Sequence, residues 1–149
     1  MAQFARPEAD TLIGNWADDG EGTSDIYTAI DEEVADDNDY IASPVSPSDE
    51  PYVCKLSAVD DPQSSSGHTV RYRYRKDQAD GDQIDLTVEL REGYVDEGTP
   101  GTLIHQEVHT DISGSDWTSG SFTLDGEDAD SITDYSDLYL RFVANKPSS

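Results

Sequence analysis

Apolar and polar residues alternate along the middle of the chain, in residues 52–59, 68–76 and 82–91. A period of two residues sends successive side chains to opposite faces of a strand, so each segment is predicted to form a half-buried β-strand. The faces expected to point inward consist of Tyr52, Cys54, Leu56 and Ala58 in the first strand, Val70, Tyr72 and Tyr74 in the second, and Ile84, Leu86, Val88 and Leu90 in the third.

Weaker patterns elsewhere complete an all-β prediction. Helical turns are expected at residues 26–30, capped by Ser24 or Asp25, and at residues 126–132. Short strands joined by polar turns are typical of a sandwich, so we predict a jelly-roll-like β-sandwich of roughly seven to eight antiparallel strands with one or two short helical turns. The further strands are expected near residues 102–112, 117–124 and 135–144, with a short one at Tyr40–Ile41.

The second and third of the alternating segments are predicted to form a hairpin whose turn lies at residues 77–81. A register that sets Tyr72 opposite Leu86 on the inner face also sets Arg73 opposite Asp85 on the outer face. Glu89 would point outward with Asp85 into solvent. This register satisfies both faces at once, and a slip of one residue would break both.

The chain, residues 1–149, has the length of one domain. Its first 50 residues differ from the rest. They are predicted to form an extended, loop-rich arm that packs on or beyond a sandwich of residues 51–149. Phe4, Ile13 and Trp16 are candidate protein-contact residues in this arm. Their cover would be the sandwich of the same chain, a neighbouring subunit or another protein, and deleting residues 1–16 is expected to leave the sandwich folded.

Three prolines mark the end of the arm. They lie within residues 43–51, which are predicted to form a loop, because proline lacks the N–H that a central strand must donate.

Charge is the most unusual property of the chain. Its 149 residues hold 33 Asp and Glu against 9 Lys and Arg, a net charge of −24. A nucleic acid is not expected as a partner, because binding phosphates requires concentrated cations. Self-repulsion at this charge destabilises a compact state in dilute buffer, whereas molar salt screens it, so we interpret the surface as an adaptation to very salty, halophilic conditions. The alternative is an ordinary acidic, soluble protein.

No catalytic, cofactor or metal motif is recognisable in the sequence. The protein is therefore expected not to be an enzyme, and no catalytic, cofactor-binding or metal-ligating residue is assigned. Cys54 is expected to be a small core residue. His105 and His109 are too far apart along one strand for a single zinc ion and are expected to be solvated, while a surface calcium ion in an acidic loop stays open. No signal peptide or membrane span is visible.

Four of the nine cations lie within residues 71–76. Arg71, Arg73 and Arg75 occupy the face of their strand that is predicted to point outward, so they are candidate protein-contact residues as well. Two interpretations stay open, cross-strand pairing with acidic neighbours and a docking stripe for another acidic protein. The tryptophans and tyrosines also leave a sugar-binding platform open, although such residues more often serve as core anchors.

Several sequence blocks are spread over nearly the whole chain. They include Gly14-Asn15-Trp16, Asp25 to Glu32, Asp36 to Ile41, Asp60-Asp61-Pro62, Arg71 to Lys76, Asp82 to Leu86 and Ile132 to Leu138. In these blocks the chain resembles small virion proteins of tailed phages and haloarchaeal tailed viruses. The resemblance rests on structural blocks and transfers no catalytic residue.

The resemblance implies a structural virion protein at the capsid surface. It would be a decoration or cement protein that binds and stabilises the major capsid protein lattice, as a homo-oligomer with a trimer favoured, without nucleic acid, membrane or cofactor. The alternative is a carbohydrate- or receptor-binding module of a viral tail or spike. A secreted accessory module of a polysaccharide-degrading enzyme is a weaker third interpretation.

The charge predicts that folding depends on salt. The midpoint of thermal unfolding should be higher in about 2 M KCl than in about 0.1 M KCl, because the screening length falls from about 10 Å to 3 Å or less. Circular dichroism at both concentrations measures the midpoint. An equal or lower midpoint at the higher concentration would contradict the argument from self-repulsion.

Overall fold

The computed structural model describes residues 3–31, 34, 36–76, 82–114 and 116–147. The turn predicted at residues 77–81 lies outside the described residues. Within the described part, nine strands and two helical turns follow one another along the chain. They are β1 (Pro7–Leu12), β2 (Ala17–Asp18), η1 (Ile26–Ala29), β3 (Ile41–Ala42), β4 (Glu50–Leu56), β5 (Thr69–Tyr74), β6 (Asp85–Glu92), β7 (Thr102–His109), β8 (Thr118–Thr123), α1 (Gly126–Asp130) and β9 (Leu138–Asn145).

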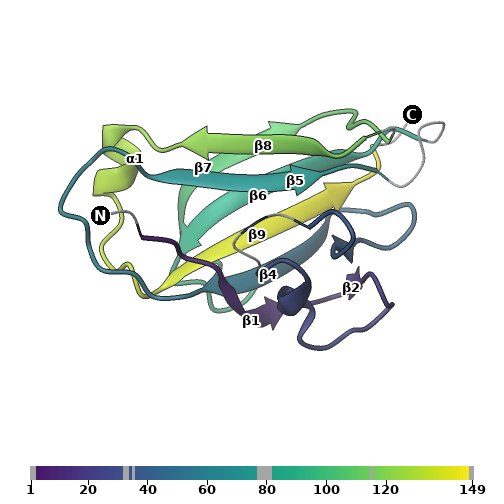
Figure 1. Cartoon of the computed structure of the whole chain (residues 1–149), viewed down its shortest axis with the longest axis horizontal. Helices are drawn as coiled ribbons and strands as arrows, with labels where there is room; N and C mark the ends of the chain where they lie inside the picture. The colour runs from purple at the N-terminus through teal and green to yellow at the C-terminus, as the bar shows by residue number, and fades with distance from the viewer. Residues whose placement is uncertain (1–2, 32–33, 35, 77–81, 115, 148–149) are drawn as a thin grey trace.

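The strands form a sandwich of two unequal sheets. The larger sheet has five strands in the order β1-β4-β9-β6-β7, and the smaller sheet is the pair β5-β8. Figure 1 shows β5 and β8 side by side in front of the larger sheet. A third, minor sheet pairs β2 with β3. Every pairing is antiparallel, so the predicted all-β sandwich is confirmed, while the jelly-roll arrangement is not.

The predicted hairpin between residues 68–76 and 82–91 is wrong. β5 pairs with β8, which sets Tyr72 opposite Gly120 and Arg73 opposite Ser119. β6 lies in the other sheet, between β9 and β7. The alternation had identified the inward face of each strand correctly, but many strands can satisfy one face, so the pattern could not identify the partner.

The core lies between the sheets and uses the predicted faces. Tyr52, Cys54 and Leu56 from β4 and three residues from β6 are buried there. Burial raises the pKa of the Cys54 thiol to about 12, so this residue is the core hydrophobe that was expected. Ala58 is exposed because β4 ends at Leu56. The buried members of the core are Trp16, Ile26, Tyr52, Cys54, Leu56, Leu86, Val88, Leu90, Ile104, Ile112, Phe122, Leu124, Ala129, Ile132, Leu138, Leu140 and Ala144.

Pro51 belongs to a central strand, contrary to the loop predicted for residues 43–51. It lies opposite Val143 of β9, whereas the pairing of β1 with β4 stops at Val53. No β1 residue therefore faces Pro51 on that side, and a proline is tolerated where a strand has no partner that needs its N–H.

The first 50 residues pack on the sandwich and contribute to its core. β1 is an edge strand of the larger sheet. Trp16 is only 6% exposed, and its indole N–H donates to the Glu50 carbonyl at 3.0 Å. The cover of Trp16 is thus the sandwich of its own chain, and removing residues 1–16 would take away an edge strand and a core side chain.

Asp10 fixes the helical turn η1 from a distance. Its carboxylate accepts hydrogen bonds from the Ile26 and Tyr27 N–H groups, both at 2.9 Å, and from the Tyr52 hydroxyl at 2.7 Å. Asp25 occupies the N-cap position as expected but makes no side-chain cap, so the cap was assigned to the wrong aspartate. A cap supplied by a distant strand leaves no local sequence signal.

The outer face of the larger sheet holds a second buried layer. Glu89, expected in solvent, is only 6% exposed. It accepts from Arg91 at 2.6 Å and from Arg141 of the neighbouring strand β9 at 3.2 Å. Arg141 also pairs with Glu97 at 2.6 Å, whose carboxylate accepts from the Tyr94 hydroxyl at 2.7 Å.

This layer has an apolar part beside the charges. Val53, Tyr94 and Tyr139 form a small buried cluster there, with Leu12 packed against it. The loop that carries Tyr94 and Glu97 turns back at Gly101, where an added Cβ would come within 2.2 Å of the Glu92 carbonyl oxygen. Only glycine fits this close approach, so the loop that completes the outer layer depends on it.

Removing the Glu89 charge should destabilise the fold strongly. The substitution Glu89→Gln leaves two arginines partly buried without their shared partner and should cost about 3–5 kcal/mol. The matched control Glu8→Gln removes an exposed partner of Lys55 and should cost less than about 1 kcal/mol. Urea unfolding measures both, and the Glu89 cost should persist in about 2 M KCl because buried pairs are screened little. Equal costs would contradict the buried network.

Candidate functional site

Strand β5 presents two chemically different faces. Arg71 and Arg73 are exposed on its outer face, with Arg75 just beyond its end, while Val70, Tyr72 and Tyr74 turn inward. The face assignment made from the sequence is therefore confirmed. Together with Lys76, the three arginines place four of the chain's nine cations on β5 and the two residues that follow it, in a chain with a net charge of −24.

The three arginines have different surroundings. Arg73 binds Asp37 through two hydrogen bonds of 2.7 and 2.9 Å, and a third of 2.6 Å reaches the Ser119 hydroxyl. The Arg75 guanidinium lies 5.3 Å from the centre of the Trp117 ring. Arg71 has no hydrogen bond or ion pair within the described part of the chain. The predicted pairing of Arg73 with Asp85 is wrong, because Asp85 lies on the other sheet.

The inner face of β5 carries an aromatic network around His109. The Tyr72 hydroxyl lies 2.6 Å from His109 Nε2, and the Tyr74 hydroxyl lies 3.1 Å from Nδ1. Burial first, and then the nearby Glu107 and Tyr74, raise the pKa of Tyr72 to about 12, so its hydroxyl stays protonated and can donate. Opposite it, an added Cβ on Gly120 would come within 2.4 Å of the Tyr72 ring. The missing side chain makes room for this tyrosine.

His105 sits in a clamp of two carboxylates. Its Nδ1 lies 3.0 Å from Asp128 and its Nε2 lies 3.1 Å from Glu107. A carboxylate only accepts hydrogen bonds, so both contacts form together only with the protonated ring. Burial lowers the pKa of His105, but the hydrogen bonds and charges of Glu107 and Asp128 outweigh this effect and raise it above its ordinary value of 6.5.

Neither of these histidines is solvated as predicted. The pairing of β6 with β7 shifts at Ile104, since Leu90 faces His105 while Arg91 faces Leu103. This bulge inserts one residue and places His105 and His109 toward the smaller sheet, where His105 packs 4.6 Å from the Phe122 ring. Sequence alternation cannot locate a bulge of this kind.

A cleft of about 1840 Å³ follows β5 between the two sheets. Residues 67–76 all line it on one side. The main sheet contributes Leu56, Leu140 and Phe142 to the opposite wall. Protein interiors are normally packed without such voids, so the sandwich is incompletely filled along this strand.

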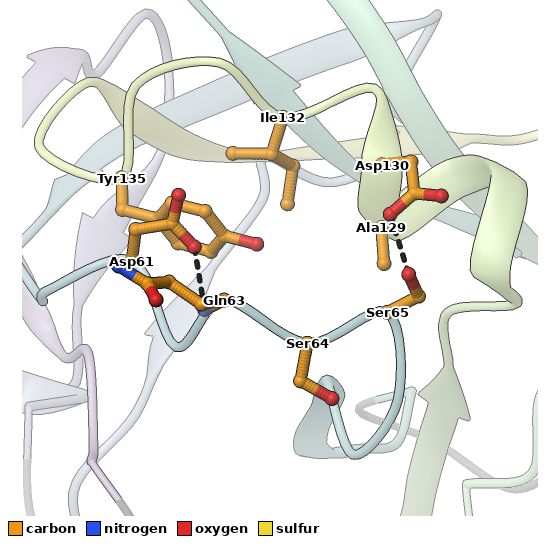
Figure 2. Close-up of a pocket in the computed structure, with 8 residues that line it drawn as sticks. All are labelled: Asp61, Gln63, Ser64, Ser65, Ala129, Asp130, Ile132 and Tyr135. Atoms are coloured by element: carbon orange, nitrogen blue, oxygen red, sulfur yellow. Dashed lines mark hydrogen bonds between the residues drawn. The ribbon is translucent and has the colours of Figure 1, made fainter.

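A smaller pocket of about 310 Å³ lies beside α1 (Figure 2). The Tyr135 ring, Ile132 and Ala129 give it apolar walls. Figure 2 shows the polar part of the rim, where the Ser65 hydroxyl donates to Asp130 at 2.6 Å and the Gln63 N–H donates to Asp61 at 2.7 Å.

One buried polar atom lies near this pocket. The Tyr135 hydroxyl lies 2.7 Å from His68 Nε2, and His68 Nδ1 is buried without a hydrogen-bond partner in the described chain.

The candidate contact residues of the N-terminal segment are not brought together with the arginines. Trp16 is buried and Ile13 packs partly against the core. Phe4 is 62% exposed, with the Arg6 guanidinium 5.8 Å from its ring centre. Phe4 and the three arginines therefore remain as surface candidates. The tyrosine and histidine network was missed, and the period-two spacing of Tyr72 and Tyr74 was its only signal.

The described residues contain no group of three His, Cys, Asp or Glu side chains arranged to hold a metal ion. No helix among them is long and apolar enough to cross a membrane. Comparisons of the chain with protein-family models, curated proteins and solved structures find no match.

The His105 clamp predicts a pH-dependent stability. The pKa of His105 is higher in the folded chain than in the unfolded chain, where it is near 6.5. The protonated ring therefore stabilises the fold fully at a pH below 6.5, and this stabilisation is lost as the pH rises through the pKa of the folded state. The stability difference between wild type and His105→Gln should therefore shrink as the pH rises above about 6.5. Glu107→Gln, which keeps the Asp128 carboxylate, should show a smaller pH dependence than wild type. Urea unfolding at each pH measures the difference, and a constant difference would contradict the clamp.

Proposed function

We propose that this protein is a non-catalytic virion component, a decoration protein that binds and stabilises the major capsid protein lattice at the particle surface. The resemblance of its sequence blocks to small virion proteins supports the setting. The observation that supports the attachment is the arginine face, defined as Arg71 and Arg73 on the exposed side of β5 and Arg75 just beyond its end. A homo-oligomer, with a trimer favoured, is part of this proposal.

The burial of the N-terminal candidates favours the arginine face for attachment. Trp16 and Ile13 are engaged by their own chain, whereas Arg71 is exposed and free of polar partners in the described part. Arginine is enriched at protein interfaces because its planar guanidinium binds carboxylates through two parallel hydrogen bonds. Asp37 and Arg73 already display this geometry within the chain.

Molar salt restricts how such a face can act. At about 1 M salt the screening length is about 3 Å, so long-range attraction to a partner is suppressed. Attachment then relies on charges in direct contact and on apolar burial, which salt does not weaken. The arginine face adjoins an apolar cleft and so offers both kinds of contact within one region.

A second candidate function is receptor or carbohydrate binding on a tail or spike. The pocket of Figure 2 favours it, because an aromatic ring beside hydroxyl, amide and carboxylate groups is suited to a sugar. Asp61 and Asp130 each keep acceptor capacity beyond the hydrogen bonds they already make.

Copy number in purified particles tests the proposal. A decoration protein should approach the major capsid protein in abundance, and quantitative mass spectrometry of particles from the source culture measures the ratio. A few copies per particle would instead support the tail or spike function. Absence from particles would overturn both.

Reconstitution on undecorated particles tests the face. The double variant Arg71→Gln/Arg75→Gln should reduce occupancy at least about fivefold. The matched control Lys55→Gln removes a cation from β4, outside the cleft, and should bind as wild type does. Equal occupancy of both variants would exclude the arginine face.

A further inference from the structure

Among the described residues, the smaller sheet has an unpaired edge along β5. The Leu124 N–H donates to the His68 carbonyl at 2.8 Å, which marks a hydrogen-bonded pair in the register of β5 with β8. Such pairs recur at every second residue. The backbone groups of Thr69, Arg71 and Arg73 therefore point away from β8, and no hydrogen bond to them occurs within the described part of the chain.

The cleft runs along this same edge. In Figure 1 the free side of β5 faces away from β8 and toward the region of β9 and β4. Val70 and Tyr72 lie on the β5 side of the cleft and Leu140 and Phe142 on the other, and three of these four are only partly buried. A typical small-ligand pocket holds about 300–1,000 Å³, so a cleft of about 1840 Å³ beside a strand is large for a compact ligand.

The segment that contains Asp37 and Tyr40 covers only part of the β5 edge. Asp37 binds Arg73, and the Tyr40 ring lies 5.8 Å from the Trp117 ring, so this segment is fastened near the Tyr74 end of β5. Arg71, one pleat away, has no polar partner in the described chain. The contact of Asp37 with Arg73 shows that a crossing acidic segment can pair with the arginine face.

Strand geometry then defines what would fit. A segment laid against β5 would direct alternate side chains outward, beside the arginine face, and the others into the cleft. Carboxylates suit the first set, and apolar side chains suit the second. Main-chain hydrogen bonds to Thr69, Arg71 and Arg73 would supply affinity, as in other cases of strand addition.

We propose that the open edge of β5 binds an extended segment of a partner protein in which acidic and apolar residues alternate. The segment adds a third strand to the smaller sheet and fills the cleft. This inference rests on the proposed function and deepens it, since it names the chemistry of the partner segment on the attachment face.

A peptide-binding experiment tests the inference. The probe is a fluorescent peptide of about eight residues, alternating aspartate and valine. Fluorescence anisotropy in about 2 M KCl, where the fold should be most stable, measures its affinity. The wild-type protein should bind it, and a peptide of alternating lysine and valine should bind at least about tenfold more weakly.

Two proline variants separate the edge from the fold. Arg71→Pro removes an N–H from the open edge and should weaken peptide binding at least about tenfold without breaking the ladder with β8. Ser121→Pro is the matched control, because Ser121 faces Arg71 across the sheet and its N–H points to the opposite edge. It should bind as wild type does. Arg71→Thr keeps the N–H and should lose less affinity than Arg71→Pro.

Several outcomes would overturn the inference. They are no binding by the wild-type protein, equal binding of the lysine peptide, or equal binding by Arg71→Pro. A dimer that Arg71→Pro alone dissolves would make a second copy the occupant and also overturn it. If the protein binds the peptide but is absent from virus particles, the proposed function is overturned and the inference stands. If the protein is abundant on particles but does not bind the peptide, the inference is overturned and the proposed function stands.

Discussion

The unequal size of the two sheets is the constraint on which the rest of the structure depends. Five strands present a wide apolar face, and the two strands β5 and β8 can cover only part of it. The first 50 residues make up some of the deficit, since Trp16 and Ile26 enter the core and Asp10 fixes the turn η1 over the sheet. What they leave uncovered is the cleft along β5. The cleft along β5 thus follows from the same unequal sheet sizes that shape the fold.

The scarcity of cations is the second constraint. With 9 basic against 33 acidic residues, each cation has many possible partners, and the structure shows which contacts are used. Arg91 and Arg141 both pair with Glu89 in a partly buried network on the outer face of the larger sheet. A buried pair adds little net stability, but removing one partner leaves an uncompensated buried charge. The arginine face of β5 differs, because its charges remain exposed.

The sequence predicted faces better than partners. Alternation identified the inward residues of β4, β5 and β6, because burial on one face imposes a period of two regardless of what covers it. It failed for the pairing of β5, whose true partner begins more than forty residues later, at Thr118. It also failed at Glu89, because a loop closing over an outward face leaves no periodic signal. In the candidate site, the sequence identified the arginines but not the His105 clamp. A single bulge in β7 changes which face of the sheet the following residues occupy, and sequence alternation does not reveal it.

The arginines on β5 invite a competing explanation, because charged residues on an edge strand commonly prevent pairing with other strands. That protection works by repulsion or by the cost of burying a charge next to another protein. In this chain the surrounding charge is negative, so an arginine on the edge attracts the commonest side chains of its own surface and would protect poorly against them. The opposite edge makes the comparison sharper. Ser119 and Ser121 on β8 are exposed and carry no charge. These residues of β8 therefore provide no charge that would prevent the edge from pairing with another strand. Protection of the edges alone would distribute the cations the other way, whereas the proposed recognition of an acidic strand beside an apolar cleft would account for their position.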